Sequence, residues 1–229
     1  MAKHIGIVAV SVEGAALCYR EIAEMAATVV GEHDHPQMSM HTHSLAEYMV
    51  GIRNGDWDKV ADLILDSAAK LEALGADILI LPDNTTHQAW ELFSPKTGAS
   101  WLHIAEVVAE EASARGLRHL GILGTRYLCA SSVYSSVLEQ AGLKCSIPEE
   151  KQIEKINGII YDELVNGKFL QGSKGYLLHA VHELAENGCD GVVLGCTEIP
   201  LILNESDSPV PLLDSTRLLA RAALKAATK

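Results

Sequence analysis

The stretch "GVVLGCTEIP", residues 191–200, combines a short apolar run with a glycine, a cysteine and a threonine. The run is typical of a buried strand, and the residues after it are typical of a turn that leads into a helix. A second stretch, "ILILPDNTTH" at residues 78–87, has the same outline, with Asp83 where the first has Cys196. The chain therefore contains the same strand end twice, with a different side chain at the tip.

These strand ends belong to a longer internal repeat. Gly75 aligns with Gly188 and Asp77 with Asp190, and both pairs are 113 positions apart, as are the two tip residues. A constant offset over such a stretch favours two related α/β halves over chance similarity. We expect the tips to meet across a cleft, because ligands of open parallel sheets bind beyond the carboxyl ends of the strands.

Short apolar runs alternate with longer helical patterns, an order typical of parallel sheets covered by helices. We expect two pseudo-symmetric, Rossmann-like α/β halves, the first formed by residues 1–98 plus 209–229 and the second by residues 99–208. The expected strands are 4–10, 37–43, 77–82, 119–125, 143–147, 190–195 and 210–213, and the expected helices are 14–31, 57–74, 99–115, 132–141, 150–165 and 175–187.

The composition argues against several classes of protein. A formal net charge of −12 disfavours a nucleic-acid or anionic-membrane binder, because both need a basic surface. No apolar run approaches the ~20 residues that span a bilayer, and the N-terminus has no signal-peptide pattern. The five cysteines contain no CxxC pair, which disfavours a disulfide framework. We therefore expect a cytoplasmic protein with reduced thiols and with no nucleic-acid or membrane partner.

Polar residues follow both tips. Asn84 and Thr85 follow the first tip, and Thr197 and Glu198 follow the second. Backbone N–H groups and the dipole of a helix N-terminus favour an anion at such positions, so we expect these side chains to bind a substrate carboxylate. Helix capping is the alternative, and it is compatible with binding.

Cys196 is the sharpest candidate for chemistry. A free cysteine has a pKa of ~8.5, which a helix N-terminus lowers, and a thiolate acts as a base or as a nucleophile. The alternative is a buried, inert cysteine. We assign that alternative to Cys18, Cys129, Cys145 and Cys189, which lack a comparable strand-tip setting.

The motifs "LGCTEIPLIL", "LPDNTTH", "GILGT" and "VPLLDSTRLLA" together cover essentially the whole chain. They resemble the aspartate/glutamate racemase superfamily, which also includes hydantoin racemases, maleate isomerases and arylmalonate decarboxylases. The resemblance implies two pseudo-symmetric α/β halves with the site between them and no cofactor. It also implies two cysteines on opposite faces of the substrate, one removing the α-proton and the other returning it.

Carried over by this resemblance, the second family cysteine falls on Cys196 and the first on Asp83. The strand-end contacts fall on Ser11 and Thr125, beside the polar residues after the tips. Asp83 is the main departure: it is a second base, or it only orients water or substrate, or it only caps the following helix. Val165 replaces a lysine that grips a carboxylate in aspartate-specific members, so the substrate is better described as a small carboxylate.

A histidine-rich stretch raises a metal alternative. His41 and His43 share one face of an expected strand, and His35 or Asp34 would supply a third zinc ligand. The spacing matches no strong motif, so we expect no metal site. We expect instead that this strand end lines a pocket, with a histidine or Ser44 facing the substrate.

The leading hypothesis is a cofactor-independent amino-acid racemase or epimerase in which Cys196 and Asp83 act as the acid/base pair. The second is a dicarboxylate isomerase, decarboxylase or related lyase that uses Cys196 alone. The third is a small-carboxylate-binding protein that has lost catalysis through the change at Asp83. The resemblance further implies a homodimer. The substrate and its handedness are left open.

Overall fold

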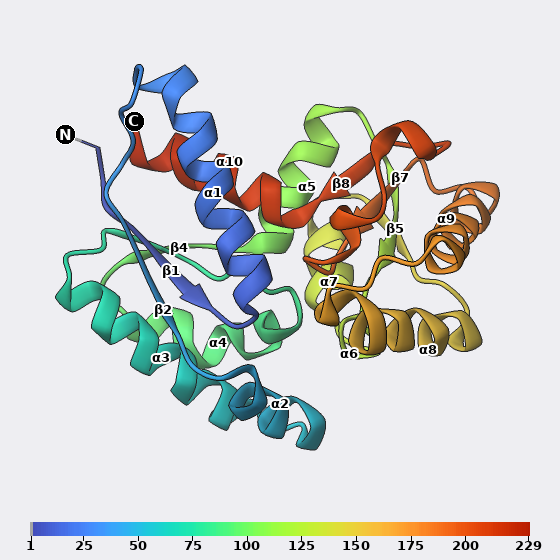
Figure 1. The fold of residues 1–229 in the computed structure, drawn as a ribbon, viewed down its shortest axis with the longest axis horizontal. Helices are drawn as coiled ribbons and strands as arrows, with labels where there is room; N and C mark the ends of the chain where they lie inside the picture. Colours follow the sequence, from blue (N-terminus) through green and yellow to red (C-terminus); the bar gives the residue numbers. More distant parts are fainter. Residues whose placement is uncertain (1) are drawn as a thin grey trace. The chain divides into compact units, whose positions relative to one another are not determined.

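The computed structural model describes residues 2–229 and contains two parallel β-sheets flanked by helices (Figure 1). Its strands are β1 (Ile5–Ala9), β2 (Met38–Thr42), β3 (Ile78–Ile80), β4 (Ser100–Leu102), β5 (His119–Leu123), β6 (Lys144–Ser146), β7 (Gly191–Leu194) and β8 (Leu212–Asp214). The first sheet has the order β2-β1-β3-β4 and the second β6-β5-β7-β8. The predicted α/β class with two parallel sheets is confirmed.

Helices follow most of the strands along the chain. They are α1 (Val12–Val29), α2 (Leu45–Asn54), α3 (Trp57–Ala73), α4 (Trp90–Phe93), α5 (Ile104–Ala114), α6 (Arg126–Cys129), α7 (Val133–Gln140), α8 (Glu150–Gly158), α9 (Gln171–Glu186) and α10 (Ser215–Ala227). In the described part of the chain, no helix is both long and apolar enough to cross a membrane.

The chain divides into two units. Unit 1 contains the chain up to Ile104 together with Thr216–Lys229, and unit 2 is Ala105–Ser215. The last helix, α10, therefore returns to the first unit after β8 has completed the second sheet. Figure 1 shows α10 beside α1, and the Arg217 guanidinium pairs with Glu21 across them, with Nε 2.9 Å from Oε1.

The central strands form the core of each sheet. All residues of β1, β3 and β7 are buried, as expected for parallel strands that are covered on both faces. In unit 1, α1 and α3 pack against β1; in unit 2, α9 packs against β5 and β7. Because both faces of these strands are buried, their residues are apolar without a break and do not alternate between apolar and polar.

Hydrogen bonds hold together the starts of the central strands of unit 1. The backbone N–H of His4 donates to Asp77 Oδ2 at 2.8 Å, and that of Asp77 donates back to the His4 carbonyl at 2.9 Å. The His4 ring completes the set, because its Nε2 lies 2.9 Å from the Oγ of Ser39 on β2. One histidine therefore ties the starts of three adjacent strands together.

Unit 2 repeats this arrangement and adds a bond from the Arg118 N–H to Asp190 Oδ2 at 2.8 Å. The N–H of His119 donates to Asp190 Oδ1 at 2.9 Å, and the N–H of Asp190 donates to the His119 carbonyl at 2.9 Å. His119 Nε2 lies 2.8 Å from Ser146 Oγ on β6. The 113-residue offset read from the sequence thus marks a repeat of hydrogen bonds as well as of strand order.

The glycine before each of these aspartates has a structural cause. Gly75 and Gly188 have φ angles of +88° and +90°, where a side chain is strained. Each follows a helix, α3 or α9, and turns the chain into the next strand. Only glycine makes this turn without strain, which explains why it occurs at both positions.

Two segments, after β2 and around β4, differ from the helices that the sequence predicted. The helix predicted over residues 99–115 begins only at Ile104, because Ser100–Leu102 form β4 and pair with β3. This edge strand is three residues long, too short to show a period-2 pattern in the sequence. Helix α2 was not predicted; it starts at its cap, Ser44, and ends before Gly55, whose φ is +66°.

A third correction concerns residues 150–165. Helix α8 ends at Gly158 and is followed by a π turn over Ile159–Glu163 and a 3₁₀ turn over Leu164–Asn166. Buried Ile156, Ile160 and Leu164 continue the apolar period through both turns. Periodicity alone therefore predicts one continuous helix, whereas the structure has an α-helix followed by a π turn and a 3₁₀ turn.

The turn before β7 gives a stability test. We expect Gly188→Ala to lower the free energy of unfolding by about 1–2 kcal/mol, because alanine is strained at a φ of +90°. The matched control is Gly175→Ala inside α9, where an added Cβ meets open space and alanine should add up to about 1 kcal/mol. Urea unfolding measures both. Equal effects of the two substitutions would contradict the strain at Gly188.

Candidate active site

The first strand tip is built around Asp83. This half-buried residue lies three positions after the end of β3, and its Oδ1 accepts hydrogen bonds from the Thr86 N–H at 2.8 Å and the Thr86 hydroxyl at 2.9 Å. These bonds cap a 3₁₀ helix at Thr85–Ala89, where the sequence predicted an ordinary helix. The capping interpretation of Asp83 thus describes a real contact. Its role as a base stays a prediction.

Three of the predicted binding residues are buried polar side chains in unit 1. Asn84, Thr85 and Ser11 are buried, and Ser11 Oγ accepts from the Gly14 N–H at 3.2 Å as the cap of α1. They follow β1 and β3, which are neighbours in the sheet, so they lie at the same carboxyl edge. Ser44 follows β2 but is exposed and caps α2.

His87, whose position at the start of the following helix predicts a structural role, supports this tip. Its Nδ1 lies 2.7 Å from the Asp83 carbonyl, and its Nε2 accepts from the Ile104 N–H at 3.2 Å. These contacts assign the proton to Nδ1. The ring stacks on Trp90 with centroids 5.5 Å apart. His87 therefore ties the Asp83 loop to the start of α5.

Cys196 forms the second tip, in unit 2. It is buried after β7, and its Sγ donates a hydrogen bond to Glu198 Oε2 over 2.9 Å. Glu198 is only 2% exposed, and its other oxygen, Oε1, is buried with no hydrogen-bond partner in the described chain. A buried carboxylate oxygen without a partner is costly, so this atom calls for a donor.

The ends of β5 and β7 approach closely beside Cys196. A Cβ added to Gly195 would lie 2.5 Å from Leu128 Cδ2 and 3.3 Å from the Leu123 carbonyl oxygen, so this position needs glycine. Thr125 ends the neighbouring strand, is buried, and caps α6 by accepting from the Leu128 N–H at 3.2 Å. Thr197 is buried next to Cys196. Unit 2 therefore gathers a thiol, a carboxylate and two hydroxyls at one sheet edge.

The other cysteines of unit 2 differ from Cys196. Burial raises the pKa of Cys129 to about 12 and that of Cys145 to about 11, and it also raises the pKa of Cys189. These thiols stay protonated at neutral pH. Inert thiols of this kind match the role that the sequence analysis gave them.

Comparison with known proteins places the chain in a family. Residues 6–223 match the family model of the Asp/Glu/hydantoin racemases. A broad specificity amino-acid racemase of Bacillus subtilis, RacX, is 26% identical over 189 residues, which are 82% of this chain and 81% of the relative. The chain belongs to the Asp/Glu/hydantoin racemase family, as the resemblance of its motifs predicted.

Solved structures agree. A proposed Asp/Glu racemase of Yersinia pestis is 29% identical and superposes with a TM-score of 0.91 over 99% of this chain and 100% of its own. An aspartate racemase homologue of Pyrococcus horikoshii is 26% identical, with a TM-score of 0.86 and full coverage of both chains. Glutamate racemase of Aquifex pyrophilus is 19% identical and has a TM-score of 0.67 over 96% of this chain and 82% of its own, which shows a shared fold.

The buried histidines beside the Asp83 loop predict a pH effect. Burial, with a smaller contribution from His103, lowers the pKa of His87 from 6.5 to about 3, and burial lowers that of His103 to about 4. A lowered pKa favours the neutral ring in the folded state. This stability is therefore complete above pH 6.5 and is lost as the pH falls, by about 1.4 kcal/mol per pH unit for each histidine.

Urea unfolding between pH 7 and pH 5 measures this loss. We expect His87→Gln to reduce the slope, because glutamine has no ring to protonate. His182→Gln, at an exposed position on α9, is the control and should leave the slope unchanged. A His87→Gln slope equal to that of the wild type would contradict the assignment.

Proposed function

We propose that this protein is a cofactor-independent amino-acid racemase in which Cys196 and Asp83 exchange the α-proton of a small amino acid. Family membership and the racemases among its relatives support the class of reaction. The observation that carries the role of Cys196 is its hydrogen bond to buried Glu198 at the carboxyl end of β7. Ligands of parallel sheets bind at this end.

Glu198 can accept the proton of the Cys196 thiol. A proton that moves from Sγ to Oε2 leaves a thiolate, and the thiolate can remove the α-proton of the substrate. Asp83, as the acid, returns a proton to the other face of the carbon. In the reverse direction the Asp83 carboxylate removes the proton and the Cys196 thiol returns one, so the two side chains exchange roles between the enantiomers.

The polar groups at the second tip fit an amino-acid substrate. Glu198 Oε1 is a buried acceptor without a partner, and a substrate ammonium group supplies the donor it needs. Thr197 and Thr125 bring hydroxyl groups to the same edge, which can donate to a carboxylate. At the first tip, Asn84, Thr85 and Ser11 provide equivalent groups. We propose these residues, with Ser44 at the end of β2, as the binding set.

One contact favours the second candidate, an isomerase or lyase that uses Cys196 alone. The Asp83 carboxylate is engaged by Thr86 as a helix cap, and a cap needs no catalytic role. In that case Asp83 orients the loop and the thiol performs the chemistry.

The proposal includes a homodimer in the cytoplasm. The five free cysteines are consistent with a reducing compartment.

Deuterium exchange tests the thiol. We expect wild-type protein in D₂O to exchange the α-proton of its amino-acid substrate, which a panel of aspartate, glutamate and neutral amino acids identifies by NMR. Cys196→Ala should abolish the exchange, because it removes the proposed base. Cys145→Ala, in the same unit but on β6, is the matched control and should keep it. Full exchange in Cys196→Ala would refute the role.

Asp83→Asn separates the two candidates. Asparagine caps a helix as well as aspartate does, so the loop should keep its fold while the base is lost. For a two-base racemase we expect racemisation to fall by at least about 100-fold. A lyase that uses Cys196 alone should keep most of its activity. If Asp83→Cys creates racemase activity that the wild type lacks, the natural protein is a binder or catalyses another reaction.

A further inference from the structure

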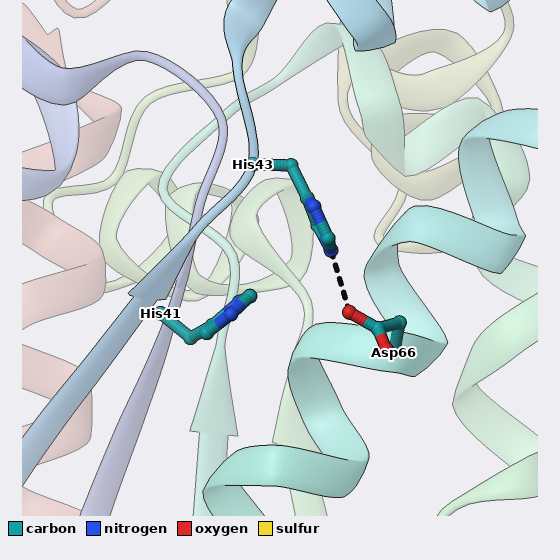
Figure 2. A group of neighbouring side chains, drawn as sticks. All are labelled: His41, His43 and Asp66. Carbon is teal, nitrogen blue, oxygen red and sulfur yellow. Dashed lines mark hydrogen bonds and ion pairs between the residues drawn. The ribbon is translucent and has the colours of Figure 1, made fainter.

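Three side chains of unit 1 converge beside the carboxyl end of β2. His41 comes from β2, His43 from the residue after it, and Asp66 from the middle of α3. One nitrogen of each ring and one carboxylate oxygen all lie within 4.8 Å of one another. Figure 2 shows the two rings and the carboxylate pointing into the same space between strand and helix.

The fold creates this cluster in a way that the sequence does not reveal. His41 and His43 share a face because side chains alternate along a strand. The third member is Asp66, 23 residues after His43, because α3 packs against β2. His35, considered as a third ligand from its spacing, is exposed and turns its Nδ1 to the Pro36 carbonyl at 2.8 Å.

Two imidazoles and one carboxylate are a donor set that suits zinc. Zn²⁺ with three protein ligands of this type keeps a fourth position for water. The ring of His41 is also held as a metal ligand requires, since its Nδ1 lies 2.9 Å from the hydroxyl of fully buried Ser67. That contact orients the ring and leaves Nε2 as the ligand atom.

Lys70 occupies the cation position next to this set. Its Nζ lies 2.5 Å from Asp66 Oδ2, the same oxygen that lies 2.7 Å from His43 Nε2. The Lys70 side chain is half exposed, so it can swing into solvent when another cation binds Asp66.

We propose that His41, His43 and Asp66 form a binding site for a divalent transition cation, Zn²⁺ in the first instance, with Lys70 as an internal competitor for Asp66. The cation would bridge the end of β2 to α3. The proposed racemase chemistry has no step that needs this metal. The competing interpretation is a polar network, His43–Asp66–Lys70, that only stabilises the packing of α3 on β2.

Isothermal titration of untagged, chelator-treated protein with ZnCl₂ at pH 8 tests the proposal. We expect one equivalent to bind. His43→Gln and Asp66→Asn should each weaken binding by at least about 10-fold, the effect that even an outer-shell loss has at zinc sites. The control His35→Gln removes an exposed histidine that precedes β2 and lies outside the cluster, and it should leave affinity unchanged. Binding that is the same in all three variants would overturn the site.

Lys70→Gln supplies a test that a chance surface site would fail. Removing the competing ammonium should tighten zinc binding severalfold while leaving the two imidazoles and the carboxylate in place. Cobalt in place of zinc should give the visible absorption of a tetrahedral ion in wild type and lose it in His43→Gln. Absence of zinc binding in both wild type and Lys70→Gln leaves only the polar network and contradicts the proposal.

Discussion

The carboxylates of Asp77 and Asp190 hold each half of this molecule in register. Each accepts a hydrogen bond from the backbone at the start of the neighbouring central strand, and each returns one from its own N–H. Because parallel strands run in step from this end, the same contacts decide where the strands finish. The tip residues of β3 and β7 owe their place at the sheet edge to hydrogen bonds made at the other end of the strands.

The repeat also shows how one scaffold carries two kinds of tip. At the first tip, the Asp83 carboxylate caps its own loop by accepting from the Thr86 N–H, and neutral His87 hydrogen-bonds to the Asp83 carbonyl. At the second, a thiol turns to a buried carboxylate two residues on. The scaffold contacts are the same in the two units, so the difference in chemistry comes from a few residues at each strand end.

The sequence predicted the central features well because they depend on local signals. The glycine–aspartate repeat, the buried runs and the parallel order each follow from residues close in the chain. Features that depend on distant contacts were missed: β4 is defined by its pairing with β3, and Asp66 approaches His43 only because α3 packs on β2. The polar residues after Cys196 were found by spacing. That Glu198 turns back toward the sulfur is a matter of side-chain direction, which spacing does not encode.

The path of the C-terminal helix has a consequence for how the protein forms during synthesis. Unit 2 is one continuous segment, so all of its parts have emerged once Ser215 leaves the ribosome. Unit 1 begins earlier, but it is complete only when α10 has been made and lies against α1. The hydrogen bond from the Lys3 N–H to the Ala227 carbonyl, at 2.8 Å, also forms only then. The half that is translated first is therefore the half that is completed last, against the usual order in which domains fold as they emerge.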